Sequence, residues 1–356
     1  MKDTKKYAYI DAMRGLAILL VILVHTSQSI ADKTPAVLSA ALGQFGVQLF
    51  FVASALTLCL SYNQRMDEKH RLIAFLLRRW FRIAPLYLIG ILLYFSVSAY
   101  RELHLGLFYD FHQNYTLKKI LSNVLLLHGL IPSANNNVVP GGWSIGTEVL
   151  FYLAFPLLFW WLGSMRHVLL AWIGYVTVLL CLFLAGLLHV SNNSFAYFNI
   201  LVQLPVFLSG FLLFHLRYNK QDRLQLIGLL GCLFAFLALW YYWRLQPVRF
   251  LLLPAASGML FCFVGLYLAK LSQFPRIITE IGRRSYSMYI LHFLASWHLA
   301  PLLDTNITGA LGGNLSFLIN FFIATMLTFW LSGYSFKYLE KPFVATGGKI
   351  IEKHFQ

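Results

Sequence analysis

Two ionisable side chains, Arg14 and His25, lie inside the first apolar segment of the chain. A charged group near the centre of a bilayer costs at least about 2.5–3.5 kcal/mol, so such groups usually mark a pathway or a reactive site. Their spacing is close to three helical turns, or about 16 Å along one helix face. The pair predicts a polar passage through the membrane, with the guanidinium near the inner end of the helix and the imidazole in its outer half. The structural alternative is an arginine that extends to the headgroups and a core histidine bonded to a neighbouring helix.

A buried carboxylate is the second candidate for chemistry. Glu148 follows Gly141-Gly142-Trp143-Ser144 at the predicted start of an apolar helix, where Ser144 is a natural N-cap. Glu148 then lies about 7 Å, and His25 about 9 Å, below the outer ends of their helices. We expect the carboxylate to hold one nitrogen of His25, which makes the other nitrogen a better base. The alternative is a glutamate that only stabilises the helix start.

Two arginines one turn apart, Arg79 and Arg82, stand at the inner mouth of the third apolar segment with Trp80 between them. Guanidinium groups bind phosphate oxygens in pairs and stack on aromatic planes, so this spacing suits a phosphate-bearing ligand. Anchoring to lipid phosphates explains the same residues equally well.

Two further segments break the apolar pattern. Tyr286, Tyr289 and His292 recur every three residues and predict a ladder of two hydroxyls and an imidazole on one helix face. The alternative is an interfacial aromatic belt with a core histidine. The segment Glu340-Lys341-Pro342 is expected to end and anchor the last helix, with Glu340 paired to an inner arginine.

Apolar helices must position these groups, because 59% of the residues are hydrophobic and 12% are charged. Soluble domains carry about 25% charged residues. We therefore expect an all-α, polytopic membrane bundle of about ten transmembrane helices in a single domain. The expected spans are residues 10–31, 37–62, 83–100, 144–163, 168–189, 197–216, 224–243, 250–270, 286–303 and 316–336.

The net charge of +15 does not indicate nucleic-acid binding, because the basic residues are distributed by side. With ten spans and an internal N-terminus, 22 of the 28 Lys and Arg residues fall on the inner side and 6 on the outer side. This asymmetry follows the positive-inside rule and predicts that both termini are cytoplasmic. The four cysteines lie in apolar spans with neither zinc nor disulfide spacing, and we expect no metal.

The ordered motifs resemble acyltransferase family 3, a group of membrane O-acyltransferases. The resemblance rests on motifs in family order over residues 11–342: Arg14-x10-His25, Phe50-Phe51-Val52-Ala53-Ser54, Arg79-x-x-Arg82, Trp143-Ser144-Ile145-x-x-Glu148, Ser285–His292 and Glu340-Lys341-Pro342. Two departures are visible. Ala55 stands where relatives usually have glycine, and the chain has no fused extracytoplasmic domain, so it either completes the transfer or passes the acyl group to a separate protein.

The resemblance implies a ten-helix bacterial inner-membrane enzyme. It implies transfer of an acyl group, commonly acetyl from cytoplasmic acetyl-CoA, to a hydroxyl of a sugar or lipid-linked glycan such as O-antigen lipopolysaccharide, capsule or exopolysaccharide. The catalytic residues it implies are His25, with Arg14 and Glu148. Whether the acyl group is acetyl or longer, and which sugar accepts it, stays open, as does the oligomeric state.

In the expected mechanism, donor phosphates bind Arg79, Arg82 and Arg14, and the thioester reaches His25. His25 then deprotonates the acceptor hydroxyl or is itself transiently acylated. We assign Tyr286, Tyr289 and His292 to donor binding, and Trp143 and Ser144 to acceptor binding. The competing interpretations are a transporter of a glycan or anionic solute and a scaffold for glycan assembly.

Overall fold

A computed structural model describes residues 7–105, 108–218 and 248–355. This part of the chain is helical and contains no strand, which confirms the all-α prediction. Eight helices in it are long and apolar enough to cross a membrane, as expected for a multi-pass protein. They span Ala8–Gln28, Pro35–Asn63, Arg71–His104, Gly142–Trp161, Met165–Leu184, Phe195–Arg217, Arg249–Leu268 and Gly313–Phe355.

Two of the ten predicted spans are not among these eight. The predicted span 224–243 lies outside the described residues. The predicted span 286–303 is helical but changes its winding, since α14 (Ser285–Phe293) passes into the π-helical η4 (Leu294–Leu299) and then α15 (Ala300–Leu303). The count of ten therefore stays a prediction.

The chain divides into two compact units. Unit 1 comprises Met1–Phe50 and Leu268–Ala345, and unit 2 comprises Phe51–Tyr267 and Thr346–Gln356. The chain crosses between the units at three places, and each lies inside a helix. Phe50 and Phe51 belong to α3 (Gly46–Asn63), Tyr267 and Leu268 to α12 (Arg249–Leu268), and Ala345 and Thr346 to α17 (Lys341–Phe355).

In unit 1 the first helix, α1, is the central element. It packs against η1, α13, α14 and α16. A side chain at Gly282 of α13 would collide with the backbone of Asp11, and one at Gly15 of α1 would collide with the carbonyl of Ile278. The two helices therefore approach backbone to backbone, as small residues allow in membrane proteins. The elements of unit 1, besides those already given, are α1 (Ala8–Gln28), α2 (Pro35–Ser39), η1 (Ala40–Phe45), α13 (Arg276–Arg283), η5 (Asp304–Thr308), η6 (Gly309–Leu311), α16 (Gly313–Ser335) and η7 (Phe336–Glu340).

In unit 2 a stack of aromatic rings fills the space between helices. The ring of Phe207 stacks on Phe51 at 4.4 Å and on Phe151 at 3.9 Å between centroids. These contacts join α3, α7 and α10. The elements of unit 2, besides α3 and the end of α17, are α4 (Arg71–Leu105), α5 (Phe108–Asn114), α6 (Leu117–Val124), η2 (His128–Leu130), α7 (Gly142–Trp161), α8 (Met165–Leu184), α9 (Phe195–Phe198), α10 (Ile200–Tyr218) and α12 (Arg249–Leu268).

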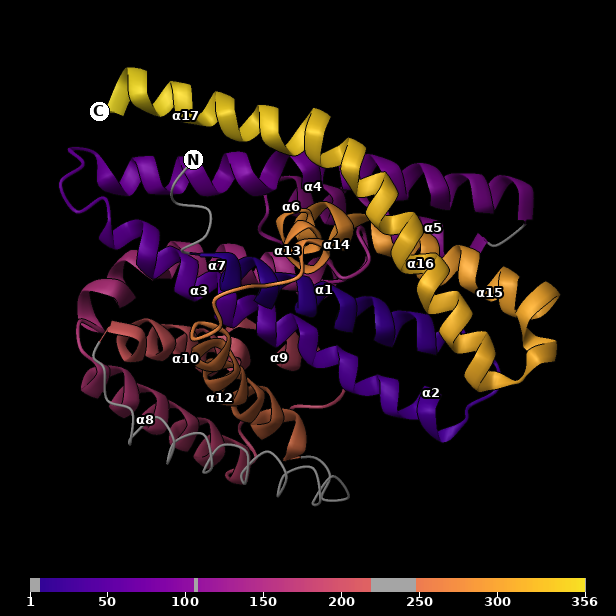
Figure 1. Ribbon diagram of the computed structural model, residues 1–356, viewed down its shortest axis with the longest axis horizontal. Helices are drawn as coiled ribbons and strands as arrows, with labels where there is room; N and C mark the ends of the chain where they lie inside the picture. The colour runs from indigo at the N-terminus through magenta and orange to yellow at the C-terminus, as the bar shows by residue number, and fades with distance from the viewer. Residues whose placement is uncertain (1–6, 106–107, 219–247, 356) are drawn as a thin grey trace. The chain divides into compact units, whose positions relative to one another are not determined.

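The end of the chain lies alongside α4 in unit 2 (Figure 1). The ring of Phe355 meets that of His70 at 6.0 Å, and Gly347 lies so close to the ring of Phe81 that a side chain there would collide with it. The C-terminal helix is therefore packed against the protein over several turns.

The prediction that Glu340-Lys341-Pro342 ends a helix is wrong. The π-helical η7 connects α16 directly to α17, which continues to Phe355. Proline disrupts a helix by clashing with the carbonyl four residues earlier and by lacking an N–H. The wider π turn immediately before Pro342 provides local room, and Pro342 stands in the first turn of α17, where proline is tolerated.

Candidate active site

His25 lies in the last turn of α1, within unit 1. Its Nδ1 is 3.2 Å from Oε1 of Gln28, one turn further along the same helix. Because an amide oxygen only accepts, Nδ1 carries the proton in this arrangement and Nε2 keeps its lone pair. The sequence predicted that Glu148 would hold this imidazole, and the contact with Gln28 was not anticipated.

A second imidazole, that of His292 in α14, lies beside His25. The two ring centroids are 5.2 Å apart, and the rings of Phe293 and Trp297 complete the wall around His25 at 4.5 and 5.6 Å. Nδ1 of His292 donates to the carbonyl of Tyr289 at 2.7 Å, so Nε2 holds a lone pair. This Nε2 is buried and has no hydrogen-bond partner among the described residues.

The helix changes from α-helical to π-helical directly after His292 and Phe293. The π-helical η4 begins at Leu294 and carries Trp297, which contacts His25. Short π-helical turns occur frequently at functional sites, because the extra residue per turn re-aims side chains. In unit 1 two imidazoles and two large rings therefore lie together where α14 passes into the π-helical η4.

The other predicted residues of unit 1 lie on the same two helices. Arg14 is half-buried in α1, three turns before His25, and Asp11 on that helix pairs with Arg283 of α13 at 3.5 Å. Tyr289 is buried and its ring meets those of Phe50 and His292 at 6.0 and 5.5 Å. Tyr286 is half-buried in the same helix. Their assignment to donor binding stays a prediction.

Glu340, at the end of η7, is buried and accepts a hydrogen bond of 2.9 Å from Ser287. Ser335 in turn donates to Ser287 at 3.2 Å. The last motif of the chain is thus bonded to the Ser285–His292 motif. This long-range bond to a serine was missed, because the sequence pattern suggested an arginine as the partner.

Glu148 lies in α7, within unit 2, and is held by hydroxyl groups. Its Oε1 accepts from the hydroxyl of Tyr152, one turn further along, at 2.6 Å, and from the hydroxyl of Ser54 in α3. His25 belongs to the other unit, so the predicted pairing of His25 with Glu148 stays a prediction. The bond from Ser54 was not anticipated, although Ser54 is the polar residue of the second motif.

Arg79 extends this cluster to a third motif. Its guanidinium carbon is 6.0 Å from the ring centroid of Tyr152 and 5.9 Å from that of Phe75. Arg79 therefore lies beside the tyrosine that holds Glu148. Arg82 is half-buried one turn later in α4. Unit 2 thus brings together side chains from the second, third and fourth motifs.

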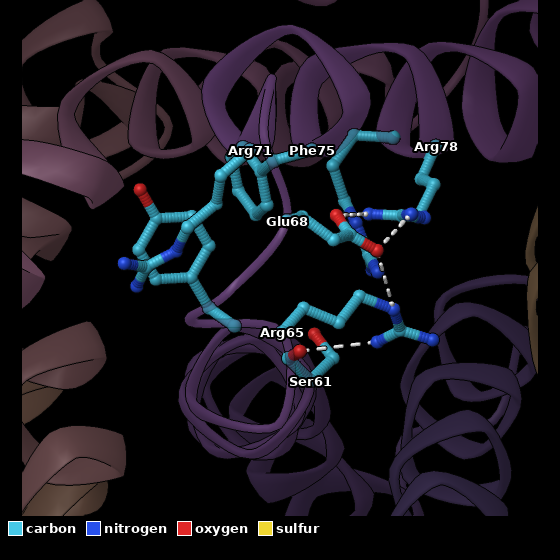
Figure 2. A pocket seen from close by; sticks show the side chains of 8 residues that line it. Ser61, Arg65, Glu68, Arg71, Phe75 and Arg78 are labelled. Carbon is cyan, nitrogen blue, oxygen red and sulfur yellow. Dashed lines mark hydrogen bonds and ion pairs between the residues drawn. The ribbon is translucent and has the colours of Figure 1, made fainter. Parts of the chain in front are cut away.

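The side chain of Arg79 also lines a pocket in unit 2 (Figure 2). The pocket contains about 220 Å³ of free space, part of it open to solvent. It is lined by Ser61, Tyr62, Arg65, Glu68, Arg71, Phe75, Arg78 and Arg79. Four guanidinium groups around one small space favour an anionic ligand that carries several acceptor oxygens.

Trp143 and Ser144 lie in the first turn of α7. The helix begins at Gly142 and its N-cap is Gly141, whose φ of 72° is in the left-handed region, so the prediction that Ser144 is the N-cap is wrong. The hydroxyl of Ser144 instead donates to the carbonyl of Gly141 at 3.1 Å. The indole of Trp143 is buried and stacks on Phe198 at 4.4 Å. Their role in acceptor binding stays a prediction.

The departure at Ala55 is matched on the neighbouring helix. Ala55 is fully buried in α3, and a side chain added at Gly210 of α10 would lie 2.6 Å from its Cβ. The close approach of α3 and α10 therefore depends on Gly210, which leaves room for the methyl group of Ala55.

A buried polar cluster around His128 supports the start of α7, and sequence analysis did not identify it. Nε2 of His128 donates to the carbonyl of Gly142 at 2.9 Å, and the hydroxyl of Tyr87 donates to Asn123 at 2.7 Å while lying 3.2 Å from the same imidazole nitrogen. Burial lowers the pKa of His128 to about 4, and the bond to Gly142 opposes this only in part. A buried histidine between two predicted spans was the available signal.

The chain matches a known protein family over most of its length. The family model described as an acyltransferase domain, which is that of acyltransferase family 3, matches residues 7–336. Neither the curated proteins nor the solved structures gave a match. The matched range covers nearly the whole chain and includes the motifs around His25, Ser54, Arg79, Glu148 and His292.

Proposed function

Since the chain belongs to acyltransferase family 3 and is a multi-pass membrane acyltransferase, we propose that it transfers an acetyl group from acetyl-CoA to a hydroxyl of an envelope glycan. The observation that carries this proposal is the environment of His25. Its Nδ1 is held by Gln28, which leaves Nε2 as a base, and aromatic rings surround it. A neutral imidazole in such surroundings suits the removal of a proton from an alcohol.

The proposed step is direct. Nε2 of His25 takes the proton of the acceptor hydroxyl while the oxygen attacks the thioester carbonyl. The C–S bond then breaks, the new O–C bond completes the ester, and the thiolate of coenzyme A leaves and is protonated by the imidazolium. Arg14 and Glu148 are assigned to the catalytic group with His25. Because Gln28 holds Nδ1, Glu148 is proposed to raise the basicity of His25 by its negative charge. In the covalent alternative the imidazole is transiently acetylated, so labelled acetyl-CoA would leave its label on the protein during turnover.

Donor binding is assigned to Arg79 and Arg82, with Arg14, Tyr286, Tyr289 and His292. The support for it is the concentration of guanidinium groups near Arg79 and the strength of paired bonds between arginine and phosphate. Trp143 and Ser144 are assigned to the acceptor. No metal is part of the proposed reaction.

The proposed location is the bacterial inner membrane, with both termini in the cytoplasm. The support is the excess of Lys and Arg on the predicted inner side. Reporter fusions after Gln356 should report the cytoplasm, and a tag near Asn192 should report the outer side. An external C-terminus would contradict this orientation.

The decisive experiment uses the purified full-length protein in lipid nanodiscs with labelled acetyl-CoA and a glycan acceptor. The enzyme should release coenzyme A and label the acceptor, and both should depend on His25. Acid quenching within a single turnover separates direct transfer from an acetylated histidine. Solute uptake into proteoliposomes without release of coenzyme A would instead support a transporter. Mass spectrometry of the envelope glycan with and without the protein identifies the acceptor.

A further inference from the structure

The arginine pocket of unit 2 already contains an anion, and that anion is part of the protein. Glu68 lies between α3 and α4 and is the carboxylate among the eight lining residues, beside four arginines (Figure 2). The formal charge of these lining groups is therefore strongly positive. Only 11% of the Glu68 side chain is exposed, so its carboxylate points into the pocket rather than to solvent.

Glu68 is held in the geometry with which arginine binds phosphate. Nη1 of Arg78 donates to Oε2 at 2.8 Å, and Nη2 donates to Oε1 at 2.6 Å. Nε of Arg65 lies 3.5 Å from Oε1. Two parallel bonds from one guanidinium to two oxygens also form between arginine and a phosphate group. The carboxylate thus occupies the position that two phosphate oxygens would take on Arg78.

The pocket has hydrogen-bond donors that Glu68 does not use. Nε and Nη2 of Arg71 and Nε of Arg79 are buried and have no hydrogen-bond partner among the described residues. The guanidinium carbon of Arg71 lies 3.4 Å from the ring centroid of Tyr62, and the cation is attracted to the face of this ring. Buried donors without partners are costly, and a tetrahedral anion with more oxygens than a carboxylate could satisfy them.

We propose that Glu68 is an internal counter-ion that occupies a phosphate site, and that a phosphate group of the acyl donor displaces it on binding. The inference rests on the proposed function, because it takes the donor to be a coenzyme A thioester. It adds a carboxylate that competes with the donor, and it extends the donor site to Arg65, Arg71 and Arg78. Glu68 keeps the arginine cluster together while no donor is bound.

The test compares the affinity of the full-length protein for coenzyme A before and after Glu68→Gln. The amide keeps the shape of the side chain but removes the competing charge, so coenzyme A should bind about tenfold more tightly, the effect of one lost charge-assisted bond. The matched control is Asp67→Asn, which makes the same charge change at the adjacent exposed residue and should leave the affinity unchanged. Equal or weaker binding by a folded Glu68→Gln variant overturns the proposal.

Two further arms identify the phosphate that enters. Dephospho-coenzyme A lacks the 3′-phosphate, so a gain confined to coenzyme A assigns the pocket to that group, and a gain for both ligands assigns it to the diphosphate. Phosphatidylglycerol in the nanodisc tests a lipid source. If this lipid abolishes the gain that Glu68→Gln produces in phosphatidylcholine nanodiscs, the pocket takes a lipid phosphate and its assignment to the donor is overturned.

Hydrogen exchange in the unmodified protein provides a readout that does not depend on the variant folding. Release of Glu68 from Arg78 should increase exchange in residues 64–70 when coenzyme A binds, whereas protection of this segment overturns displacement. The result is distinguishable from a failure of the proposed function. If Arg79→Ala with Arg82→Ala weakens donor binding while Glu68→Gln changes nothing, the donor site stands and the counter-ion role falls.

Discussion

Imidazoles with hydrogen bonds occur in both units, and these bonds differ in the sequence separation that they connect. In unit 1, His25 bonds Gln28 and His292 bonds the carbonyl of Tyr289, each three residues away on the same helix. In unit 2, His128 bonds Gly142, 14 residues away, and lies 3.2 Å from the hydroxyl of Tyr87, 41 residues away.

This difference in sequence separation predicts which histidine affects activity and which affects stability. A bond within one helical turn fixes the tautomer and direction of a ring without joining separate segments, so the ring can exchange a proton at little cost to the fold. Bonds between distant segments act as cross-links, and protonation or removal of such a ring weakens the packing. We therefore expect His25 to govern activity and His128 to govern stability.

The largest effect is expected from His25→Ala. It should insert and fold normally but lose acyl transfer by about 10²- to 10⁴-fold, the usual contribution of a general base. The assay is release of coenzyme A from acetyl-CoA by purified protein, together with its thermal unfolding midpoint. His189→Ala is the control, because His189 is exposed in the segment between α8 and α9. Near-normal acyl transfer by His25→Ala would contradict the role of His25 as the general base.

The donor arginines should give the next largest effect. Arg79→Ala or Arg82→Ala should weaken acetyl-CoA binding by about 10- to 100-fold, since each charge-assisted contact to a phosphate contributes about 1.5–3 kcal/mol. Titration calorimetry on the detergent-solubilised protein measures this. Protein yield should change little, and unchanged donor affinity in the double variant would mean that the two residues only anchor the helix to lipid phosphates.

Glu148→Gln tests whether the carboxylate belongs with chemistry or with packing. If it raises the basicity of the catalytic histidine, the variant should show a large loss of rate, nearly intact donor affinity and a shifted pH optimum. Ser54→Ala is the companion, because it removes one bond to Glu148 and keeps the charge. Its stability loss should be about 1 kcal/mol. If Glu148→Gln lowers only yield and unfolding midpoint, the glutamate is structural.

The smallest effect on activity is expected from His128, where stability should respond instead. Its pKa is lowered to about 4 in the folded protein, so the unfolded chain binds the proton first as the pH falls through 6.5. Folding should therefore lose up to about 3 kcal/mol between pH 6.5 and 4. Thermal unfolding at pH 7, 5.5 and 4.5 measures this slope, and His128→Gln, which keeps a donor for Gly142, should flatten it. A slope equal in both proteins would contradict the cross-link role.

Sequence analysis predicted the parts of the fold that depend on composition and period. The first span was predicted over 10–31 and α1 covers Ala8–Gln28, because a continuous apolar segment has one solution in a membrane. The order of motifs also predicted the family. The π-helical segments η4 and η7 were not predictable, since they depend on the packing of neighbouring helices rather than on residue type.

The partners of the predicted site residues could not be read from the sequence. Glu148 is bonded to Ser54, 94 residues away, and Glu340 to Ser287, 53 residues away. Glu148 was expected to meet an imidazole and Glu340 an arginine, and their bonds to hydroxyl groups were not anticipated. A serine in an apolar helix can donate a hydrogen bond to the backbone of its own helix. Its presence in the sequence therefore does not indicate a partner on another helix.

The contact between Ala55 and Gly210 has an evolutionary consequence. The space between α3 and α10 holds the methyl group of Ala55 and leaves no room for a second one at Gly210. A comparison of the second motif alone counts Ala55 as a mismatch. A comparison of positions 55 and 210 together tests whether a change at one position is compensated at the other. Relatives with glycine in the second motif should therefore tolerate a larger residue at the position of Gly210, and the two sites should co-vary.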